Sequence, residues 1–374
     1  MAQNVIIVGG VALGSKAACR FKRLEPGSRV TIIDQDRFVS YGGCGIPFYV
    51  SGDVSDVNDL RKTSFHMLRD EAFFKNCKDI EVLTRTRVER IDRENRQIHI
   101  LREDGSTDAL PYDQLVLGTG SRPRRLPIPG ADLPMVHTAS NLNDAQAIKE
   151  LVTNGKVERA VVIGGGFIGL EMAEALADMW EVETSIVEYT RQIMPGFVSS
   201  MFARMAQREM ENNGVRFYLG EQVQALEGTD SVKTVVTDNR RLEADLVVMA
   251  VGVTPNVELA RDAGLTVGPT GAIAVDEHLR TSDPAIYAGG DCVSNAYIHR
   301  QVGDPLYVPL GSTANKHGRV IANHIAGKPT PFSGITCSSV VRVFDYTLGR
   351  TGLSERMAQL LGIDYEVTTW SGQD

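Results

Sequence analysis

Five cysteines are the side chains best suited to redox chemistry in this sequence. They are Cys19, Cys44, Cys77, Cys292 and Cys337, and no two of them form a CxxC pair. An odd number of widely spaced cysteines disfavours both a disulfide framework and a zinc site. The seven histidines also lack metal-ligand spacing, so we expect no metal. At least one cysteine could instead be a working thiol.

A first glycine-rich turn could hold a phosphate group. This turn, Gly9–Gly14, follows the apolar run Val5–Val8 and precedes a helix expected over about Ser15–Leu24. The next apolar run, Val30–Ile33, ends at Asp34, 20 residues after the last glycine of the turn. This order predicts a strand, a turn, a helix and a second strand that ends in an acid.

The same unit occurs a second time. The turn Gly164–Gly169 follows the apolar run Ala160–Ile163 and precedes a helix expected over about Leu170–Met179. The run Thr184–Val187 then ends at Glu188, 19 residues after the last glycine of the turn. The second copy is the closer match to a GxGxxG pattern, because a valine occupies the middle glycine position of the first copy.

Both units predict dinucleotide binding. Glycine permits the tight turn and the close approach of a pyrophosphate, whose charge then sits at the helix N-terminus. The carboxylate at the strand end accepts a hydrogen bond from a ribose hydroxyl. One such turn is a weak signal, but two copies with correctly placed acids are a much stronger one. The candidate cofactor-binding residues in the two units are Gly9, Gly10, Gly14, Asp34, Gly164, Gly166, Ile168, Gly169 and Glu188.

Three later apolar runs also end in glycine turns. Gln114–Leu117 and Leu246–Val251 would each close one dinucleotide-binding domain. The third run, Ala285–Ala288, places the Asp291 carboxylate at the C-terminal edge of a sheet, where ligands bind. Asp291 is therefore a candidate for binding a cofactor hydroxyl. The turns after the first two runs contribute the candidates Thr119, Gly120 and Gly252.

Length, charge and hydropathy exclude several classes of protein. A chain of 374 residues predicts two to three domains. A net charge of −8 gives no basic field for nucleic acid. No secretion signal is visible, and the longest apolar stretches fall far below the roughly 20 residues that a membrane span needs. We therefore expect a cytoplasmic protein without a membrane span or a nucleic-acid partner.

Taken together, these motifs resemble the flavin-dependent pyridine nucleotide–disulfide oxidoreductases, in the branch with one active cysteine. Coenzyme A disulfide reductases, persulfide reductases, NADH oxidases and NADH peroxidases belong to that branch. The resemblance implies an α/β fold with two Rossmann-like domains, for FAD and NAD, plus the start of an α+β interface domain. The implied domains are FAD-binding over 1–142 and 254–330, NAD-binding over 143–253, and interface over 331–374.

The resemblance also assigns roles around the FAD. Gly9–Gly14 and Asp34 would hold its pyrophosphate and adenosine ribose, and Asp291 would bind the ribityl chain. Thr119 and Gly120 would lie where the chain crosses to the next domain. A helix that begins near Gly311 and includes Ala314 would point at the flavin pyrimidine, where its dipole would stabilise an anionic reduced ring.

In the inserted domain, the resemblance places the second glycine turn at the pyrophosphate of NAD. Glu188 would bind the ribose, which predicts NADH over NADPH because a carboxylate repels a 2′-phosphate, although Arg191 lies nearby. Phe167 would cover the nicotinamide side of the flavin, or it is a plain core phenylalanine. Glu171 would lie beside the nicotinamide, or it is an ordinary first-turn acid.

Ser40–Tyr49 resembles the redox segment of the family, in which a cysteine opens a helix under the flavin ring and Ser40 contacts the cofactor. Helix N-termini lower the pKa of a thiol, and the thiolate can attack a disulfide or persulfide sulfur. No cysteine lies five residues from Cys44 on either side, so Cys44 would cycle through a mixed disulfide, a persulfide or a sulfenic acid. The alternatives are that Cys44 is a buried inert residue, or that Cys292 takes its role.

Three features bear on the substrate. Ala12 stands where oxidase and peroxidase relatives carry a histidine, so the first turn resembles that of coenzyme A disulfide and persulfide reductases. Gly42 and Gly43 replace the usual small-Asn pair before the cysteine. The last feature is a set of cations on the first helix that would bind coenzyme A phosphates, or would form a solvated helix face: Arg20, Lys22 and Arg23.

We therefore expect an FAD enzyme that uses NADH to reduce coenzyme A disulfide, coenzyme A persulfide or polysulfide through Cys44. The rival enzyme is an NADH oxidase or peroxidase, and the rival outside catalysis is a redox-sensing flavoprotein. Relatives have an interface domain over twice as long as 331–374 and form homodimers through it. We expect either a truncated chain or a remainder absent from this sequence, which in some relatives includes a rhodanese-type domain.

Overall fold

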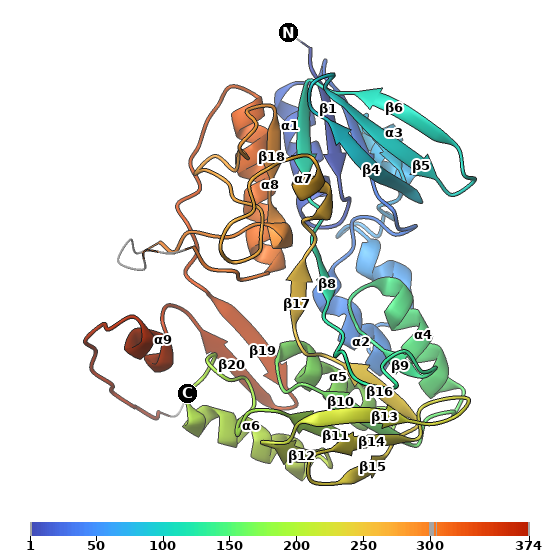
Figure 1. The fold of residues 1–374 in the computed structure, drawn as a ribbon, viewed down its shortest axis with the longest axis vertical. Helices are drawn as coiled ribbons and strands as arrows, with labels where there is room; N and C mark the ends of the chain where they lie inside the picture. Colours follow the sequence, from blue (N-terminus) through green and yellow to red (C-terminus); the bar gives the residue numbers. More distant parts are fainter. Residues whose placement is uncertain (1, 299–302, 304, 373–374) are drawn as a thin grey trace. The chain divides into compact units, whose positions relative to one another are not determined.

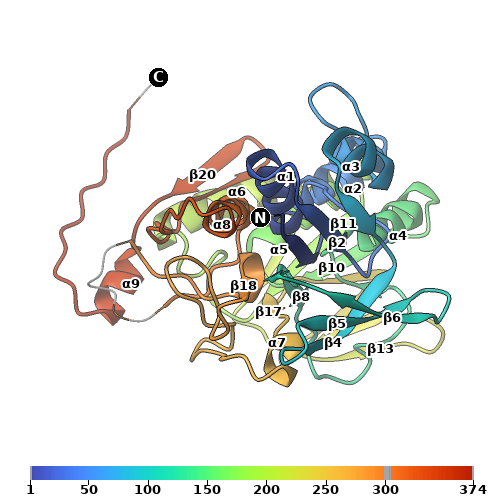
Figure 2. The ribbon, with the colours of Figure 1, turned by 90° about the horizontal axis from the view of Figure 1, so that it is seen from above.

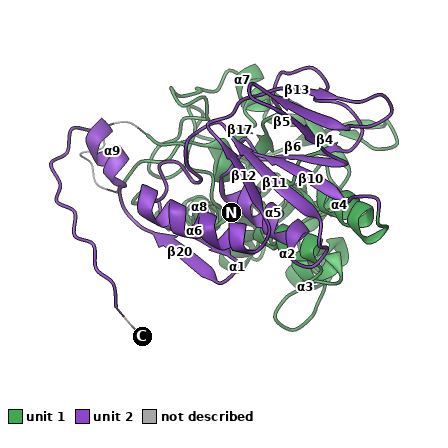
Figure 3. Ribbon diagram, turned by 90° about the horizontal axis from the view of Figure 1, so that it is seen from below, with its two compact units in different colours: residues 1–125, 137–155, 252–335 green, residues 126–136, 156–251, 336–374 purple. Residues whose placement is uncertain are grey.

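Each strand–turn–helix–strand unit lies at the centre of its own parallel sheet. The computed structural model describes residues 2–298, 303 and 305–372. They form two compact units, drawn in green and purple in Figure 3. Unit 1 comprises residues 1–125, 137–155 and 252–335, and unit 2 comprises residues 126–136, 156–251 and 336–374.

The sheet of unit 1 has five parallel strands (Figure 1). Its inner strands coincide with apolar runs in the sequence, because a strand that is covered on both faces needs apolar side chains at every position. In spatial order the strands are β18 (Ile286–Ala288), β7 (Gln114–Leu117), β1 (Asn4–Val8), β2 (Arg29–Ile33) and β3 (Glu81–Leu83).

The two faces of this sheet bury different partners. Val5 and Ile7 of β1 pack with α1 (Leu13–Leu24) and α8 (Gly311–Ile325), and these two helices lie against each other (Figures 1 and 2). The alternate residues of β1 point to the opposite face and pack against an antiparallel meander. The meander consists of β4 (Thr86–Asp92), β5 (Gln97–Arg102) and β6 (Thr107–Pro111).

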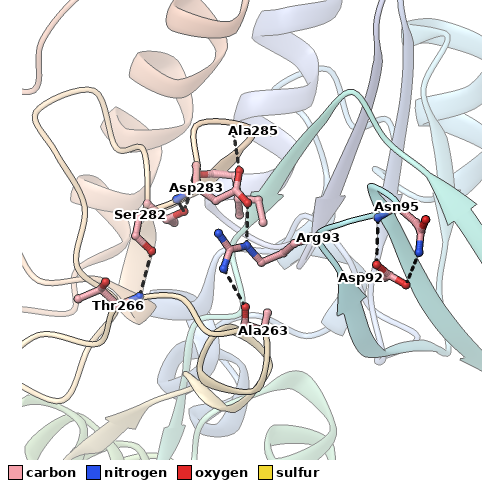
Figure 4. A network of polar contacts seen from close by, with 10 residues as sticks. Asp92, Arg93, Asn95, Ala263, Thr266, Ser282, Asp283 and Ala285 are labelled. Carbon is pink, nitrogen blue, oxygen red and sulfur yellow. Dashed lines mark hydrogen bonds and ion pairs between the residues drawn. The ribbon is translucent and has the colours of Figure 1, made fainter.

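Hydrogen bonds of Arg93 and Asp283, here called the polar joint, connect the meander to the segment that enters β18 (Figure 4). Arg93 Nε, just after β4, donates to Asp283 Oδ2 over 2.7 Å, and Arg93 Nη1 donates to the Ala263 carbonyl over 3.3 Å. Asp283 Oδ1 in turn accepts the Ala285 N–H over 2.9 Å. Since β18 leads directly to Asp291, this joint helps to fix the position of a predicted cofactor ligand.

The segment around Cys44 is held by a helix from later in the chain. Cys44 lies in a single 3₁₀ turn, Gly43–Gly45, which leads into α2 (Ile46–Ser51). α2 packs against α4 (Leu142–Thr153), where Lys149 Nζ donates to the Val54 carbonyl over 3.0 Å. Lys149 Nζ also lies 4.0 Å from the centre of the Tyr49 ring, a cation–π contact.

Several short elements complete unit 1. β8 and β17 form a two-stranded antiparallel ladder. These elements are the 3₁₀ helix Val57–Arg61, α3 (Glu71–Lys78), β8 (Ser121–Pro123), β17 (Val253–Pro255), α7 (Glu258–Asp262) and the 3₁₀ helix Gly290–Cys292.

The sheet of unit 2 repeats the plan of the first. β10 pairs in parallel with β11 and β16, and β11 pairs in parallel with β12. α5 (Phe167–Ala177) follows the second glycine turn, and α6 (Ser200–Asn212) follows β11. In spatial order the strands are β12 (Arg216–Leu219), β11 (Glu183–Glu188), β10 (Arg159–Ile163), β16 (Leu246–Met249) and β9 (Val136–His137).

Two hairpin-based elements complete unit 2. A three-stranded antiparallel sheet lies between β12 and β16 in the chain, and the hairpin β19–β20 packs on α5. Their strands are β13 (Val223–Glu227), β14 (Thr234–Thr237), β15 (Arg241–Glu243), β19 (Ser339–Val343) and β20 (Tyr346–Arg350), and the helix α9 (Glu355–Leu360) follows β20.

The α/β fold class with two Rossmann-like halves is confirmed. The compact units divide the chain differently from the implied domains: residues 126–136 group with unit 2, residues 143–155 group with unit 1, and residues 336–374 group with unit 2. The implied domain boundaries themselves stay a prediction. No helix among the described residues is long and apolar enough to cross a membrane.

Candidate active site

The first turn needs glycine at both ends. Gly9 has φ +101°, and a Cβ there would lie 2.1 Å from the Gly118 carbonyl oxygen. A Cβ at Gly14 would lie 1.8 Å from the Gly9 carbonyl oxygen. A Cβ at Gly10 would lie 2.8 Å from Val39 Cγ1. Glycine therefore lets the first turn of α1 pass directly over the ends of β1 and β7.

Asp34 closes this turn from the end of β2. Its Oδ2 accepts the Gly10 N–H over 2.7 Å, and its Oδ1 accepts the Asp36 N–H over 2.9 Å. Burial raises the pKa of the Asp34 carboxyl. Each carboxylate oxygen retains a second lone pair, so Asp34 can still accept from a ribose hydroxyl at the same place.

The helices that begin at the predicted cofactor sites have no side-chain caps. α1 begins after Ala12 and α8 begins after Leu310, and neither has a capping side chain or an acid in its first turn. By contrast, the side chains of Asp70 and Asn141 cap α3 and α4. The first N–H groups of α1 and α8 can therefore meet an anion. Ala314, the candidate in α8, is buried in that first turn.

Thr119 and Gly120 bind another part of the chain. Thr119 Oγ1 donates to the Asn256 carbonyl over 2.7 Å, and Asn256 Nδ2 donates to the Thr119 carbonyl over 2.9 Å. The Asn256 N–H donates to the Gly120 carbonyl over 3.0 Å. Gly252, which has φ +92°, accepts the Arg124 N–H over 2.9 Å. These residues join the β8 and β17 segments, and the role of Asn256 was not predicted.

Asp291 lies beside two hydroxyl groups. Ser121 Oγ donates to Asp291 Oδ2 over 3.3 Å, and the Tyr307 hydroxyl donates to the Asp291 carbonyl over 2.9 Å. Burial raises the pKa of the Asp291 carboxyl. The neighbouring Cys292 is fully buried, its thiol donates to the Gly289 carbonyl over 3.2 Å, and burial raises its pKa. The burial and the hydrogen bond favour packing as the role of Cys292, rather than the reactive role in which it would rival Cys44.

His317 supports the Asp291 turn, a role that sequence reasoning missed. The ring is fully buried in α8, and its Nδ1 accepts the Gly290 N–H over 3.0 Å. Because Gly290 can only donate there, Nδ1 carries no proton and the ring is neutral. Burial lowers the pKa of His317 to about 4. The ring also packs edge-to-face on Phe332, with 4.4 Å between centroids.

Cys44 is an exposed thiol, which contradicts the alternative that it is buried and inert. The turn that carries it is fixed on both sides: the Gly42 N–H donates to the Leu60 carbonyl over 2.9 Å, and the Gly45 N–H donates to the Gly42 carbonyl over 2.9 Å. A Cβ at Gly45 would lie 2.3 Å from Leu60 Cδ2, so the turn packs tightly on Leu60. This packing holds an accessible sulfur on a defined backbone.

Ser40 links the cysteine segment to the first glycine turn. Its N–H donates to the Gly10 carbonyl over 3.0 Å, and the residue is buried with φ +56°. Arg69 Nε donates to Ser40 Oγ over 2.9 Å, and Arg69 Nη2 also donates to that oxygen. The Ser40 hydroxyl is therefore occupied by Arg69, a residue that sequence reasoning did not single out.

Two of the three candidate cations on α1 have partners within the protein. Arg20 Nε donates to Asn323 Oδ1 over 2.9 Å. Lys22 Nζ donates to the Ser28 carbonyl over 2.7 Å and pairs with Asp79 over 2.6 Å. Arg23 is exposed. The Arg20 and Lys22 contacts give these side chains a structural role, so Arg23 is the most accessible cation of the set.

The second turn repeats the geometry of the first. Gly164 has φ +110°, and a Cβ there would lie 2.4 Å from the Ala250 carbonyl oxygen. A Cβ at Gly169 would lie 1.9 Å from the Gly164 carbonyl oxygen. Gly166 caps α5 without a capping side chain, and a Cβ there would meet no described atom within 4 Å. Gly166 therefore leaves open space at the start of α5, where Ile168 is exposed.

Glu188 occupies the place in unit 2 that Asp34 has in unit 1. Its Oε2 accepts the Gly165 N–H over 2.7 Å. Its Oε1 accepts the N–H and the hydroxyl of Thr190, each over 2.8 Å. The carboxylate is thus held in one orientation at the end of β11, with one lone pair of Oε2 left for a ribose hydroxyl.

Phe167 belongs to an aromatic pair at the start of α5. Its ring meets Phe197 edge-to-face, with 4.5 Å between centroids. Arg350 Nη1 donates to the Gly196 carbonyl over 2.6 Å and to the Phe197 carbonyl over 3.4 Å, and its guanidinium lies 5.7 Å from the centre of the Phe197 ring. The position of the Phe167 ring therefore depends on Phe197 and Arg350, which sequence reasoning missed.

Glu171 lies beyond the first turn of α5, so the alternative that it is a first-turn acid is wrong. Burial, aided by repulsion from Glu174, raises the pKa of Glu171 to about 7. A carboxyl that titrates near neutral pH can hold or release a proton under physiological conditions.

Residues 3–316 match the family model described as pyridine nucleotide-disulphide oxidoreductase. The chain belongs to this family. It is 35% identical over 364 residues to an NAD(P)H coenzyme A polysulfide/persulfide reductase of Pyrococcus horikoshii, covering 97% of this chain and 79% of the relative. It is 32% identical over 357 residues to an NADH oxidase of Methanocaldococcus jannaschii, covering 96% of this chain and 78% of the relative.

Among solved structures, the chain resembles an NAD-dependent persulfide reductase from A. fulgidus. The TM-score is 0.93 at 41% identity, and the match covers 96% of this chain. The chain spans 66% of the length of that protein. Family membership implies a flavin and a nicotinamide nucleotide as cofactors. The glycine cradles, the uncapped helix starts and the two strand-end carboxylates fit two such dinucleotides.

Proposed function

We propose that this protein is an FAD-dependent NADH oxidoreductase that reduces coenzyme A disulfide, coenzyme A persulfide or polysulfide through Cys44. The observation that carries the proposal is an exposed thiol on a segment hydrogen-bonded to the first dinucleotide turn. Ser40 makes that bond to Gly10, so the thiol segment and the turn are built as one structure. The names of the two reductase relatives support the choice of sulfur compounds.

The chemistry assigned to Cys44 balances for a disulfide acceptor. The Cys44 thiolate attacks one sulfur, a Cys44–SR mixed disulfide forms, and the other sulfur leaves as a thiolate that takes a proton. Two electrons from NADH, which a bound flavin would transfer, then reduce this mixed disulfide. That reduction restores the Cys44 thiolate and releases the second thiol. In total, NADH, one proton and one disulfide give NAD⁺ and two thiols.

The remaining site residues bind and orient. Asp34 and Glu188 accept from the ribose hydroxyls of the two dinucleotides, and the starts of α1 and α5 meet the pyrophosphates. Asp291 accepts from the ribityl chain. Glu188 favours NADH over NADPH, because its carboxylate repels a 2′-phosphate. Glu171, with its pKa of about 7, holds or releases a proton beside the nicotinamide.

The proposal also includes two binding partners, coenzyme A and a second copy of this chain. Arg23 on α1 is exposed and suits an anionic group of coenzyme A. For a homodimer, the support is apolar side chains in unit 2 that remain exposed: Val340 at 67%, Leu360 at 77% and Trp370 at 85%. Covering them against a second copy would remove this apolar surface from water.

A second candidate function is NADH oxidase, supported by the similarity to the M. jannaschii protein. In that reaction Cys44 would cycle through a sulfenic acid. Ala12 favours the sulfur acceptors, because its methyl group offers no proton donor in the first turn. A redox-sensing flavoprotein would keep both cofactors without turnover on any acceptor.

An acceptor screen with and without oxygen separates these functions. The purified protein is mixed anaerobically with NADH and, in turn, coenzyme A disulfide, polysulfide or hydrogen peroxide, and separately with NADH in aerated buffer, and NADH consumption is followed. We expect turnover with at least one sulfur acceptor. Consumption that requires oxygen or peroxide, with none on either sulfur compound, would overturn the proposal. Slow stoichiometric reduction without turnover would support the sensor.

A further inference from the structure

The helix that follows Cys44, α2, is too short to be stable without support from the rest of the protein. It has six residues, Ile46–Ser51, and no side chain caps its N-terminus. Isolated helices shorter than about 12 residues are marginal in water. Two of its polar contacts are local, since Ser51 Oγ donates to the Phe48 carbonyl over 3.0 Å and the Val54 N–H donates to the same carbonyl over 2.8 Å. Local bonds shape the segment, but they do not orient it on the rest of unit 1.

Lys149 on α4 supplies contacts from a distant part of the chain. Its Nζ donates to the carbonyl of Val54 over 3.0 Å and to the carbonyl of Ser55 over 3.4 Å. The same atom lies 4.0 Å from the centre of the Tyr49 ring. An ammonium group has three N–H donors, and two carbonyl groups and one aromatic face match these three. The donors of Lys149 are therefore used within the protein.

The surroundings of Lys149 favour these contacts over contacts with water. Tyr49 is only 9% exposed, and burial lowers the pKa of Lys149. Cation–π contacts and hydrogen bonds to a charged donor are both stronger where water is excluded. The apolar residues Ile46 and Val50 also bury α2, but apolar packing has no preferred direction. The contacts of Lys149 are directional, so they can fix the rotation of α2.

The orientation of α2 determines where the sulfur of Cys44 lies. The turn Gly43–Gly45 carries Cys44 and leads directly into α2. Before this turn, the Gly42 N–H donates to the Leu60 carbonyl over 2.9 Å. Cys44 therefore lies between two anchors, Leu60 on one side and Lys149 on the other. Misplacement of a reacting atom by about 1 Å can lower a rate by about 10²-fold, so both anchors matter for chemistry at the sulfur.

Resting on the proposed function, we propose that Lys149 is a positioning residue for Cys44. Lys149 fixes α2 through Tyr49 and the backbone of Val54 and Ser55, and α2 fixes the turn that carries the sulfur. Because its donors are used within the protein, Lys149 acts through α2 and not on the acceptor. Loss of Lys149 should therefore slow the step that breaks the mixed disulfide on Cys44, and it should spare the binding of FAD and its reduction by NADH.

Lys149→Met tests this inference in a Cys77→Ser background, which removes the other exposed thiol. Cys44 of the FAD-loaded protein is converted to its methyl disulfide with a small thiolating reagent, and NADH is added without oxygen. The S–S bond then breaks, and the products are NAD⁺, the Cys44 thiolate and methanethiol. We expect Lys149→Met to slow this reduction by at least about 10-fold. FAD content and the rate of flavin reduction by NADH, measured before the thiol is modified, should stay as in the parent protein.

Two further variants and a control sharpen the test. Lys149→Arg keeps a cation with donors and should retain most of the rate. Lys75→Met, at an exposed lysine on α3, is the matched control. Tyr49→Leu removes the aromatic face, and its effect should not add to that of Lys149→Met, because residues in contact share one interaction. Full additivity, reduction at the parent rate in Lys149→Met, or an equal fall in flavin reduction by NADH would overturn the inference.

A second measurement does not depend on turnover. Hydrogen exchange of the backbone amides in residues 42–55, followed by mass spectrometry, reports how firmly the segment is held. We expect Lys149→Met to speed exchange in this segment alone, and Lys149→Arg to preserve the parent pattern. Unchanged exchange in Lys149→Met would overturn the inference. The expected exchange pattern in a protein that cannot reduce the Cys44 methyl disulfide with NADH would overturn the proposed function alone.

Discussion

At the scale of single residues, the proposed role of Cys44 separates two half-reactions, the reduction of the flavin by NADH and the reduction of the acceptor. Replacing the thiol with a hydroxyl leaves Asp34, Asp291 and the glycine turns unchanged. We therefore expect Cys44→Ser to bind FAD, to be reduced by NADH at the parent rate, and to lose turnover on sulfur acceptors. Stopped-flow absorbance of the flavin measures the first half-reaction, and steady-state NADH consumption measures the whole cycle.

Cys77 provides the control, because it is the other exposed thiol and lies on α3. Cys77→Ser should retain full turnover. Retained turnover in Cys44→Ser would instead assign the chemistry to another group, and the proposal for Cys44 would fail.

His317 makes a pH-dependent contribution to stability at the residue scale. Its folded pKa of about 4 lies below the ordinary value of 6.5, so the unfolded chain binds a proton more readily than the folded one. The contribution of His317 to the free energy of unfolding is therefore fully present above pH 6.5, and it is lost as the pH decreases toward 4. The two pKa values differ by roughly 2.5 units, which corresponds to at most about 3 kcal/mol.

His317→Gln keeps an acceptor for the Gly290 N–H but cannot titrate. We expect the decrease in thermal midpoint between pH 7 and pH 5 to be smaller in this variant, at constant FAD concentration, while FAD affinity at pH 7 is preserved. His317→Leu should weaken FAD binding at pH 7, because the Gly290 N–H loses its partner. His66→Gln, at an exposed histidine, should leave the pH dependence unchanged. An identical pH dependence in His317→Gln would contradict the argument.

At the scale of elements, the sequence predicted the two strand–turn–helix–strand units because their signals are local. Apolar runs, glycines and the strand-end acids all lie within about 30 residues of each other. The helices begin earlier than expected, at Leu13 rather than Ser15 and at Phe167 rather than Leu170. The reason is that both helices start inside the glycine turn, without the capping side chain that marks a helix start in a sequence.

The contacts that orient the site could not be predicted, because each joins distant parts of the chain. Arg69 binds Ser40, Asn256 binds Thr119, and Lys149 contacts the ring of Tyr49. An arginine, an asparagine or a lysine outside any motif looks like an ordinary surface residue. Only the packing of its element reveals the partner.

The hairpin β19–β20 supplies a prediction at the element scale. Arg350 at the end of β20 binds the carbonyl groups of Gly196 and Phe197, and Phe197 supports Phe167. We expect Arg350→Met to lower the affinity for NADH several-fold and to leave FAD binding unchanged, because the aromatic pair loses its support. Hydrogen bonds to charged groups contribute about 1.5–3 kcal/mol each, so a measurable fall in thermal midpoint should accompany the change.

Arg342→Met is the matched control for this experiment. Arg342 lies on β19 of the same hairpin, and its side chain is 56% exposed at 3.8 Å from Glu174. Isothermal titration with NADH under anaerobic conditions gives the affinities. If Arg350→Met and Arg342→Met bind NADH equally well, the hairpin does not act through Phe197.

At the scale of the whole molecule, the two sheets repeat one plan with different acids. Asp34 and Glu188 each accept the N–H of the second glycine in their turn, over 2.7 Å in both cases. Under the proposed function, the same local geometry serves both dinucleotides, and the selectivity between them must come from the residues that differ. In unit 1 these include Ser40 and His317, and in unit 2 Phe167 is one of them.

The neighbouring positions of β7 and β18 have a consequence for biosynthesis. Leu115 pairs with Ile286, so the ribosome makes all of residues 126–251 before the edge of the first sheet can be added. α8 and its first turn emerge later still. Under the proposed function, a nascent chain therefore presents the residues for the adenosine end of FAD early and those for the ribityl and pyrimidine end late. We expect the yellow colour to be acquired only near the end of translation.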